Sequence, residues 1–204
     1  MTNWKFIFMA VLAMALMLPL TAICQPNISG PLSGTLGPGT YNVVGNCQVQ
    51  TGQSLTIAPG TTLQFTGNYN ISIYGGFQAI GTQAAPIRFT TSTPYGIWGG
   101  LRFYTGCPTS SRMEWCEVEK CNTAGNGGGI YVGNGGITII NTSVTNCTAG
   151  SGGGIFVDYS PNTIIESSYI AYCTAGNGGG IFFNSSNGPI LRYSEVAYNV
   201  STNT

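Results

Sequence analysis

The chain has 204 residues and a formal net charge of zero, and only 6% of its residues are charged, against about 25% in an average soluble domain. No excess of Lys and Arg is available to neutralise phosphates, which argues against nucleic acid as a partner. Histidine is absent, so the commonest general base and metal ligand is missing. The 31 glycines, together with abundant Asn, Thr and Ser, favour turns and strands over helices.

Residues 1–24 have the pattern of a secretory signal peptide. Lys5 supplies a positive charge, 13 apolar residues run from Phe6 to Leu18, and Pro19 ends the run. The run is shorter than the roughly 20 residues that a membrane-spanning helix needs. We therefore expect cleavage after Cys24, export from the cytoplasm and no membrane span in the processed chain. Because a cysteine follows the apolar run, lipid attachment at Cys24 is the alternative.

Residues 25–120 are predicted to form short, irregularly spaced strands. Apolar and polar residues alternate in 55–65, around the turn Pro59-Gly60, and again in 70–74. Shorter alternating segments surround Ile87 and Leu101. Such strands, bounded by Gly, Pro and Asn, suit a β-solenoid.

Residues 121–204 contain three nearly identical segments, which are Cys121–Ile130, Cys147–Ile155 and Cys173–Ile181. The three cysteines are spaced 26 residues apart, and a fixed period of this size is typical of a solenoid. Each coil is expected to contain three short parallel strands, with like residues about 4.8 Å apart in successive coils. The predicted inner column has the same period and consists of Val118, Val144, Ile170 and Val196.

These repeats resemble a known group of proteins. Gly-Gly-Gly-Ile followed by Phe182-Phe183-Asn184 is similar to the Gly-Gly-Ala-Ile and Phe-x-x-Asn repeats of chlamydial polymorphic outer-membrane proteins. The segment 55–65 resembles the opening coils of secreted, pectate-lyase-like bacterial β-helices. The resemblance implies an all-β, right-handed parallel β-helix, secreted or displayed on the outer surface of a bacterium. Division of the processed chain by the 26-residue period gives about seven coils. We also expect the chain to be truncated, because Val200–Thr204 lie where a further repeat is due.

The glycine triplets 127–129, 152–154 and 178–180 are interpreted as tight turns with positive φ at points where neighbouring coils approach closely. A nucleotide-binding loop would need a following Lys-Ser/Thr or a helix, and neither follows here. No cofactor is expected.

The cysteines allow two interpretations. Cys121, Cys147 and Cys173 are expected to form an inward column, either as packed thiols or as a pair in a disulfide. Cys107 and Cys116 are the better disulfide candidate in an oxidising compartment. We expect no metal site, because clustered Cys and His at short spacing are lacking.

No catalytic residues are predicted. The chain has one Asp, Asp158, and five scattered Glu, whereas β-helix hydrolases use clustered aspartates and lyases of the pectate type use an acidic calcium site with a basic residue. Glu117 and Glu119 flank Val118 and are expected to face solvent.

Tyr131, Phe156 and Phe182 each follow the isoleucine of a repeat, so they are expected to face outward and form an aromatic column. Stacking between coils explains the column, and an exposed column beside Asn and Thr would also suit sugar rings. The three residues are therefore the predicted ligand-binding surface.

The first functional hypothesis is a secreted or surface-displayed, non-catalytic adhesin or extracellular binding module whose partner is a carbohydrate or another cell-surface ligand. The alternative is the β-helical part of a polysaccharide lyase or glycoside hydrolase whose active residues lie beyond this chain. A purely structural stalk is a third hypothesis. An enzyme is the less favoured of the first two.

Overall fold

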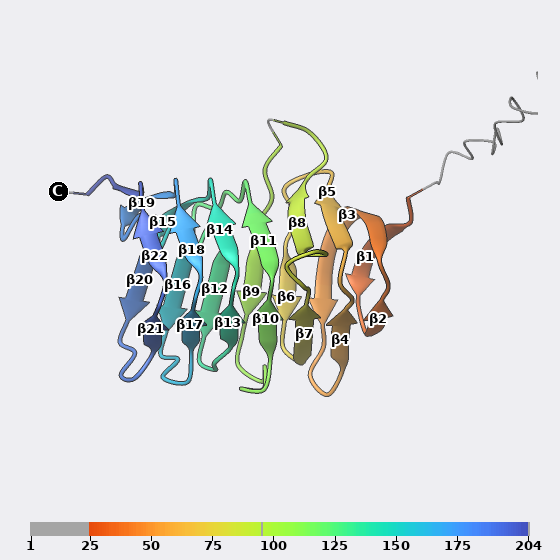
Figure 1. The fold of residues 1–204 in the computed structure, drawn as a ribbon, viewed down its shortest axis with the longest axis horizontal. Coiled ribbons are helices and arrows are strands. Elements are labelled where there is room, and N and C mark those ends of the chain that lie inside the picture. The colour runs from red at the N-terminus through yellow and green to blue at the C-terminus, as the bar shows by residue number, and fades with distance from the viewer. Residues whose placement is uncertain (1–24, 95, 204) are drawn as a thin grey trace, which may run out of the picture.

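The computed structural model describes residues 25–94 and 96–203, so the predicted signal peptide lies outside the described residues. The described chain winds into a rod of stacked coils, from the red N-terminal coil to the blue C-terminal coil (Figure 1). The described residues form 23 strands. None of the described residues form a helix that is long and apolar enough to cross a membrane.

Three columns of parallel strands run along the rod, and we call them faces 1, 2 and 3. The long strand β3 (Gly39–Val49) bends around one corner, so faces 1 and 3 belong to one 13-stranded sheet. Face 2 is a 7-stranded sheet, which corresponds to about six turns between its first and last strands. The prediction of a parallel β-helix is confirmed.

The strands divide among the faces as follows. Face 1 contains the second half of β3, then β6 (Ile71–Ile73), β9 (Leu101–Phe103), β12 (Ile130–Gly133), β16 (Ile155–Asp158) and β20 (Ile181–Asn184). Face 2 contains β2 (Gly34–Leu36), β4 (Ser54–Ile57), β7 (Gly76–Ile80), β10 (Arg112–Glu114), β13 (Thr138–Ile140), β17 (Ile164–Glu166) and β21 (Ile190–Arg192). Face 3 contains the first half of β3, then β5 (Thr61–Phe65), β8 (Ile87–Thr91), β11 (Cys116–Glu119), β14 (Ser143–Thr145), β18 (Tyr169–Ala171) and β22 (Glu195–Ala197), and β1 (Asn27–Pro31) pairs with both halves of β3.

The regular coils add a fourth, shorter face that the sequence did not predict. Residues expected to form only turns make the strands β15 (Thr148–Ser151), β19 (Thr174–Asn177) and β23 (Val200–Ser201), which pair in parallel. Each of these segments can pair because the corresponding segment of the next coil presents its backbone groups in register. The regular coils therefore have four strands rather than three.

The predicted inner column is confirmed. Val118, Val144, Ile170 and Val196 are register partners along face 3. The first three are fully buried, whereas Val196 is 44% exposed because no described strand covers β22. Burial of such columns along the whole rod provides the main apolar stabilisation of the fold.

Single residues in the left-handed conformation make the corners between faces. Three columns of non-glycine residues have φ between 45° and 60°, a region that L-residues enter at an energetic cost. These columns are Trp115, Asn141, Ser167 and Tyr193; Lys120, Asn146, Tyr172 and Tyr198; and Asn134, Tyr159 and Ser185. A one-residue bend of this kind turns the chain sharply and keeps the flanking strands in register.

The side chain of the residue after each corner forms a hydrogen bond with the backbone. The hydroxyl of Ser168 donates to the carbonyl of Glu166 at 2.8 Å and accepts the N–H of Thr142 at 3.2 Å. Cys147 and Cys173 occupy the equivalent position at the next corner, and their thiols donate to the carbonyls of Thr145 and Ala171, both at 3.2 Å. The cysteine column therefore satisfies carbonyl groups at a bend, in addition to filling the core.

Asn199 continues the cysteine column with the same function. Its side-chain carbonyl accepts the N–H of Cys173 at 2.9 Å, and its amide donates to the carbonyl of Ile170 at 2.8 Å. The substitution of Asn for Cys is thus explained by hydrogen bonding at the corner.

The predicted disulfide between Cys107 and Cys116 is wrong. All six cysteines of the described chain are buried free thiols. Cys107 donates to the hydroxyl of Ser111 at 3.2 Å, and Cys116 donates to the carbonyl of Ala79 at 3.3 Å. Each thiol has its own partner: Cys116 follows the corner residue Trp115, and Cys107 belongs to the turn before β10.

These thiols should make stability depend on pH. Burial raises the pKa of Cys47 to about 11 and that of Cys116 to about 12, from 9.0. The unfolded chain therefore loses these protons first, so their contribution is complete below about pH 9 and decreases as the pH rises toward about 12. We expect the urea midpoint, measured with a reducing agent present, to fall above about pH 9. A Cys116→Ala variant should lose less stability over this interval, and an equal loss in both proteins would contradict the assignment.

Candidate functional site

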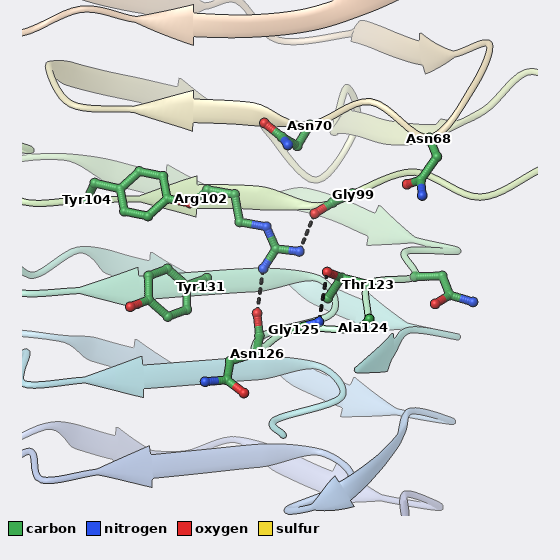
Figure 2. Close-up of a pocket in the computed structure, with 11 residues that line it drawn as sticks. Asn68, Asn70, Gly99, Arg102, Tyr104, Thr123, Ala124, Gly125, Asn126 and Tyr131 are labelled. Carbon is green, nitrogen blue, oxygen red and sulfur yellow. Dashed lines mark hydrogen bonds between the residues drawn. The ribbon is translucent and has the colours of Figure 1, made fainter. Parts of the chain in front are cut away.

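A polar groove of about 480 Å³ opens at the edge of face 1, where loops from three successive coils meet. Figure 2 shows the lining side chains arranged around the guanidinium of Arg102. Most of them carry amide or hydroxyl groups or aromatic rings. The lining consists of Asn68, Asn70, Gly99, Arg102, Tyr104, Asn122, Thr123, Ala124, Gly125, Asn126 and Tyr131.

The groove lies at the N-terminal end of the outward-facing aromatic column of face 1, where residues of other types take the same position. Tyr131 of β12 pairs in register with Arg102 of β9, and Arg102 pairs with Ser72 of β6. In the other direction, Tyr131 pairs with Phe156, and Phe156 with Phe182. Going toward the N-terminus, the outward position thus changes from an aromatic ring to a cation and then to a small hydroxyl, which leaves room beside β9.

One inserted residue forms the wall of the groove. Asn122 pairs with Thr148 and Asn126 pairs with Ser151, so the 122–126 segment has one residue more than its partner in the next coil. The extra residue interrupts the regular pairing with the fourth face between these two bridges, and the N–H of Gly125 bonds to the hydroxyl of Thr123 at 3.2 Å (Figure 2). The repeat is therefore interrupted at the groove.

A buried tryptophan anchors the opposite wall. Trp98 is fully buried, stacks on Phe65 with centroids 3.9 Å apart, and donates its indole N–H to the carbonyl of Glu119 at 2.7 Å. The next residue, Gly99, donates its N–H to the carbonyl of Tyr69 at 2.7 Å. A Cβ on Gly99 would lie only 3.0 Å from the Cβ of Asn70, so the two loops are closely packed at this wall.

Arg102 is 7% exposed, and its guanidinium holds the two walls together. It donates to the carbonyl of Gly99 in its own coil and to those of Asn126, at 2.6 Å, and Gly127 in the next coil. Burial lowers the pKa of Arg102, although an arginine stays protonated at physiological pH. The groove therefore has a fixed positive charge on its floor.

The predicted aromatic column exists, but the prediction that it is exposed is wrong at Phe156. Its ring lies between those of Tyr131, at 5.8 Å, and Phe182, at 5.4 Å, both at an interplanar angle of 14°. Phe156 is only 3% exposed, because its neighbours cover both faces of its ring. Of the three predicted residues, only Tyr131 lines the groove.

Tyrosines extend the column past the groove. The ring of Tyr104 is tilted by 49° against Tyr131 at 5.7 Å and stacks on Tyr74 at 5.0 Å. The hydroxyl of Tyr131 donates to the carboxylate of Asp158 at 3.3 Å, and the pKa of Tyr131 is raised by burial and by this carboxylate. Tyr104 and Tyr131 together form the aromatic side of the groove (Figure 2).

The carboxylates lie outside the groove lining. Glu117 and Glu119, on face 3, bond to the side chains of Arg88 and Thr90, respectively. Asp158 accepts the amide of Asn184 at 2.7 Å in addition to the hydroxyl of Tyr131. Within 25–94 and 96–203, no three His, Cys, Asp or Glu side chains come together as a metal-binding group.

Sequence reasoning missed the groove and its arginine. One signal pointed to it, which is the extra residue near Asn122 in the first of the three repeats. The first half of the chain is too irregular to align with the repeats by sequence alone, so the correspondence between Arg102 and Tyr131 emerges only from the strand register.

The comparisons with known proteins agree with this architecture. Residues 105–203 match the family model described as a right handed beta helix region. This match includes the 122–126 wall and Tyr131 and begins just after Arg102. A search of curated proteins and a search of solved structures each gave no significant match.

Proposed function

Because the chain is a right-handed parallel β-helix, we propose that it is a secreted or surface-displayed, non-catalytic bacterial module that binds carbohydrate in the groove beside face 1. The observation that carries this proposal is the lining of the groove, in which amides, hydroxyls and tyrosine rings surround one cation. Amides and hydroxyls can both donate to and accept from sugar hydroxyls, and tyrosine offers an apolar face with a polar tip.

The position of the groove also supports binding. Its walls depart from the repeat, whereas the faces that support them are regular. A rigid scaffold that presents irregular loops is the common arrangement for recognition sites. Such an adhesin-like module would hold the groove in a fixed shape before a sugar arrives.

The direct test is binding of the purified protein to an array of bacterial, plant and animal glycans, followed by calorimetric titration of those that bind. A double variant, Asn68→Ala with Asn122→Ala, should weaken binding by about tenfold or more, because each lost hydrogen bond contributes about 1 kcal/mol. Its thermal stability should stay close to that of the wild type, since neither amide is a partner in the hydrogen bonds of the described residues.

Asn187→Ala is the matched control, because Asn187 is an exposed asparagine in the turn between β20 and β21. This control should bind like the wild type. Failure of the wild type to bind any glycan would contradict the proposal and favour a structural stalk. Accumulation of unsaturated products from polyuronates would contradict the non-catalytic assignment and favour the lyase alternative.

A further inference from the structure

Arg102 differs from the other cations of the described chain in the charge of its partners. Arg88, Arg112 and Arg192 each form an ion pair, with Glu117, Glu114 and Glu166, respectively, and Lys120 pairs with Glu119 at 3.7 Å. Arg102 is the most deeply buried of these cations, yet its partners among the described residues are three neutral carbonyls.

Neutral carbonyls orient a guanidinium but leave its net charge uncompensated. A buried charge is costly unless an opposite charge accompanies it. Arg102 is also the single charged residue of the groove lining, so the groove has a formal charge of +1. An anionic ligand would supply the missing countercharge at the floor of the groove.

The guanidinium also retains hydrogen-bonding capacity. It has five N–H donors, and its three hydrogen bonds to carbonyls within the described residues leave two donors without a partner. The carbonyls come from both walls, so the group is held in place before a ligand arrives (Figure 2). Fixed, partly desolvated donors of this kind bind oxyanions more strongly than mobile surface lysines do.

The surroundings of Arg102 suit a sugar that carries such an oxyanion. The rings of Tyr104 and Tyr131 lie on one side of the guanidinium, and Asn68, Asn70 and the 122–126 wall lie around it (Figure 2). The tyrosines offer apolar contact for a sugar ring, and the amides offer partners for its hydroxyls.

We propose that the groove binds an acidic saccharide, with a carboxylate or sulfate oxyanion on Arg102 and the sugar ring between the tyrosines and the asparagines. This inference rests on the proposed carbohydrate-binding function and specifies its ligand class. Both oxyanions have the same chemistry toward a guanidinium, and the experiment distinguishes them.

The test compares matched probes on the wild-type protein by calorimetric titration. The probes are oligouronates, the same oligomers with their carboxylates methyl-esterified, sulfated neutral oligosaccharides and their unsulfated parents. We expect the acidic member of at least one pair to bind about tenfold or more tightly than its neutral member, with an affinity that falls as salt is added. The pair that shows the difference identifies the oxyanion.

Variants then show which residue causes the difference in affinity between acidic and neutral probes. Arg102→Gln should remove the difference in affinity between the acidic and neutral probes of a pair, whereas Arg102→Lys should keep part of this difference. Arg88→Gln, which removes an arginine paired on face 3, is the matched control and should bind like the wild type. Because the comparison of probes on the wild type needs no variant, the test stands even where Arg102→Gln fails to fold.

The outcomes separate this inference from the proposed function. Equal binding of acidic and neutral members would overturn the acidic ligand and leave carbohydrate binding in place. If the affinity difference between acidic and neutral probes were lost in Arg88→Gln but kept in Arg102→Gln, Arg102 would not be the residue that binds the oxyanion. Absence of binding to every saccharide would overturn both.

Discussion

Replacing Gly153 with alanine is expected to lower the free energy of unfolding by about 3 kcal/mol or more, although only one methyl group is added. A Cβ at this position would lie 2.2 Å from the carbonyl oxygen of Gly179 and 2.7 Å from that of Thr174. Both atoms belong to the backbone of the next coil, so the methyl group would have to push apart two hydrogen-bonded coils.

The neighbouring glycines of the same triplet are required for different reasons. Gly152 has a φ of 61°, which disfavours a side chain. A Cβ on Gly154 would lie 2.7 Å from a methyl carbon of Ile170 and 2.7 Å from the carbonyl oxygen of Gly180, so this residue makes room both for the apolar core and for the next coil. Gly153 is therefore the residue of the triplet at which close approach between coils acts without a positive φ and without a core side chain.

Gly125→Ala is the matched control. Its φ is not positive, and the nearest atom to an added Cβ is the hydroxyl of Thr123 at 3.6 Å, an ordinary contact. We expect this variant to lie within about 0.5 kcal/mol of the wild type, with chemical denaturation followed by circular dichroism as the measurement. Equal stability of Gly153→Ala and Gly125→Ala would contradict the close stacking of coils.

The second large effect is expected at Phe156. Phe156→Ala should cost about 3–5 kcal/mol of unfolding free energy, because it removes a buried ring and its stacking contacts with Tyr131 and Phe182. Phe156→Leu should cost less, since it keeps much of the apolar volume and loses mainly the ring stacking, at about 0.5–1.5 kcal/mol for each aromatic pair.

Tyr172→Ala is the comparison for Phe156→Ala. Tyr172 also stacks on a neighbouring ring, that of Tyr198 at 5.2 Å, but it is 54% exposed. Its truncation should cost about 1 kcal/mol or less, measured by the same denaturation experiment. A loss at Tyr172 as large as that at Phe156 would mean that stacking, rather than burial, stabilises the aromatic columns.

The regular half of the fold could be predicted from the sequence because repetition determines it. The spacing of 26 residues fixes which residues stack, and the inner column from Val118 to Val196 has the predicted register. The prediction for the glycine triplets also holds, since Gly127, Gly152 and Gly178 have positive φ and the next glycine of each triplet contacts the backbone of another coil.

The corners could not be predicted in the same way. Trp115, Lys120 and Tyr172 all adopt left-handed φ values, although none of these residue types favours that conformation. The stacking of whole coils imposes these bends, and the hydrogen bonds of the following Ser, Thr and Cys residues support them. Local propensity therefore gives no signal for the most regular bends of the molecule.

The candidate site could not be predicted either, because it lies where the repeat is interrupted. Tyr131 was selected by its place in the aromatic column, but its position in a groove depends on Arg102 and on the insertion near Asn122. Phe156 was selected by the same rule and proves to be covered by its neighbours. Alternation predicts that a side chain points away from the core, but it does not predict that the side chain is exposed to solvent.

We expect the groove around Arg102, rather than the exposed tyrosines of the corners, to bind the ligand. The most direct measurement is an NMR titration of labelled protein with an acidic oligosaccharide, observing the side-chain signals of Arg102 and of the groove asparagines. We predict that the Arg102 Nε–H and the amides of Asn68, Asn70 and Asn122 shift first and saturate together, while the rings of Tyr172 and Tyr198 do not respond. Shifts confined to those two tyrosines, with the groove signals unchanged, would contradict ligand binding in the groove.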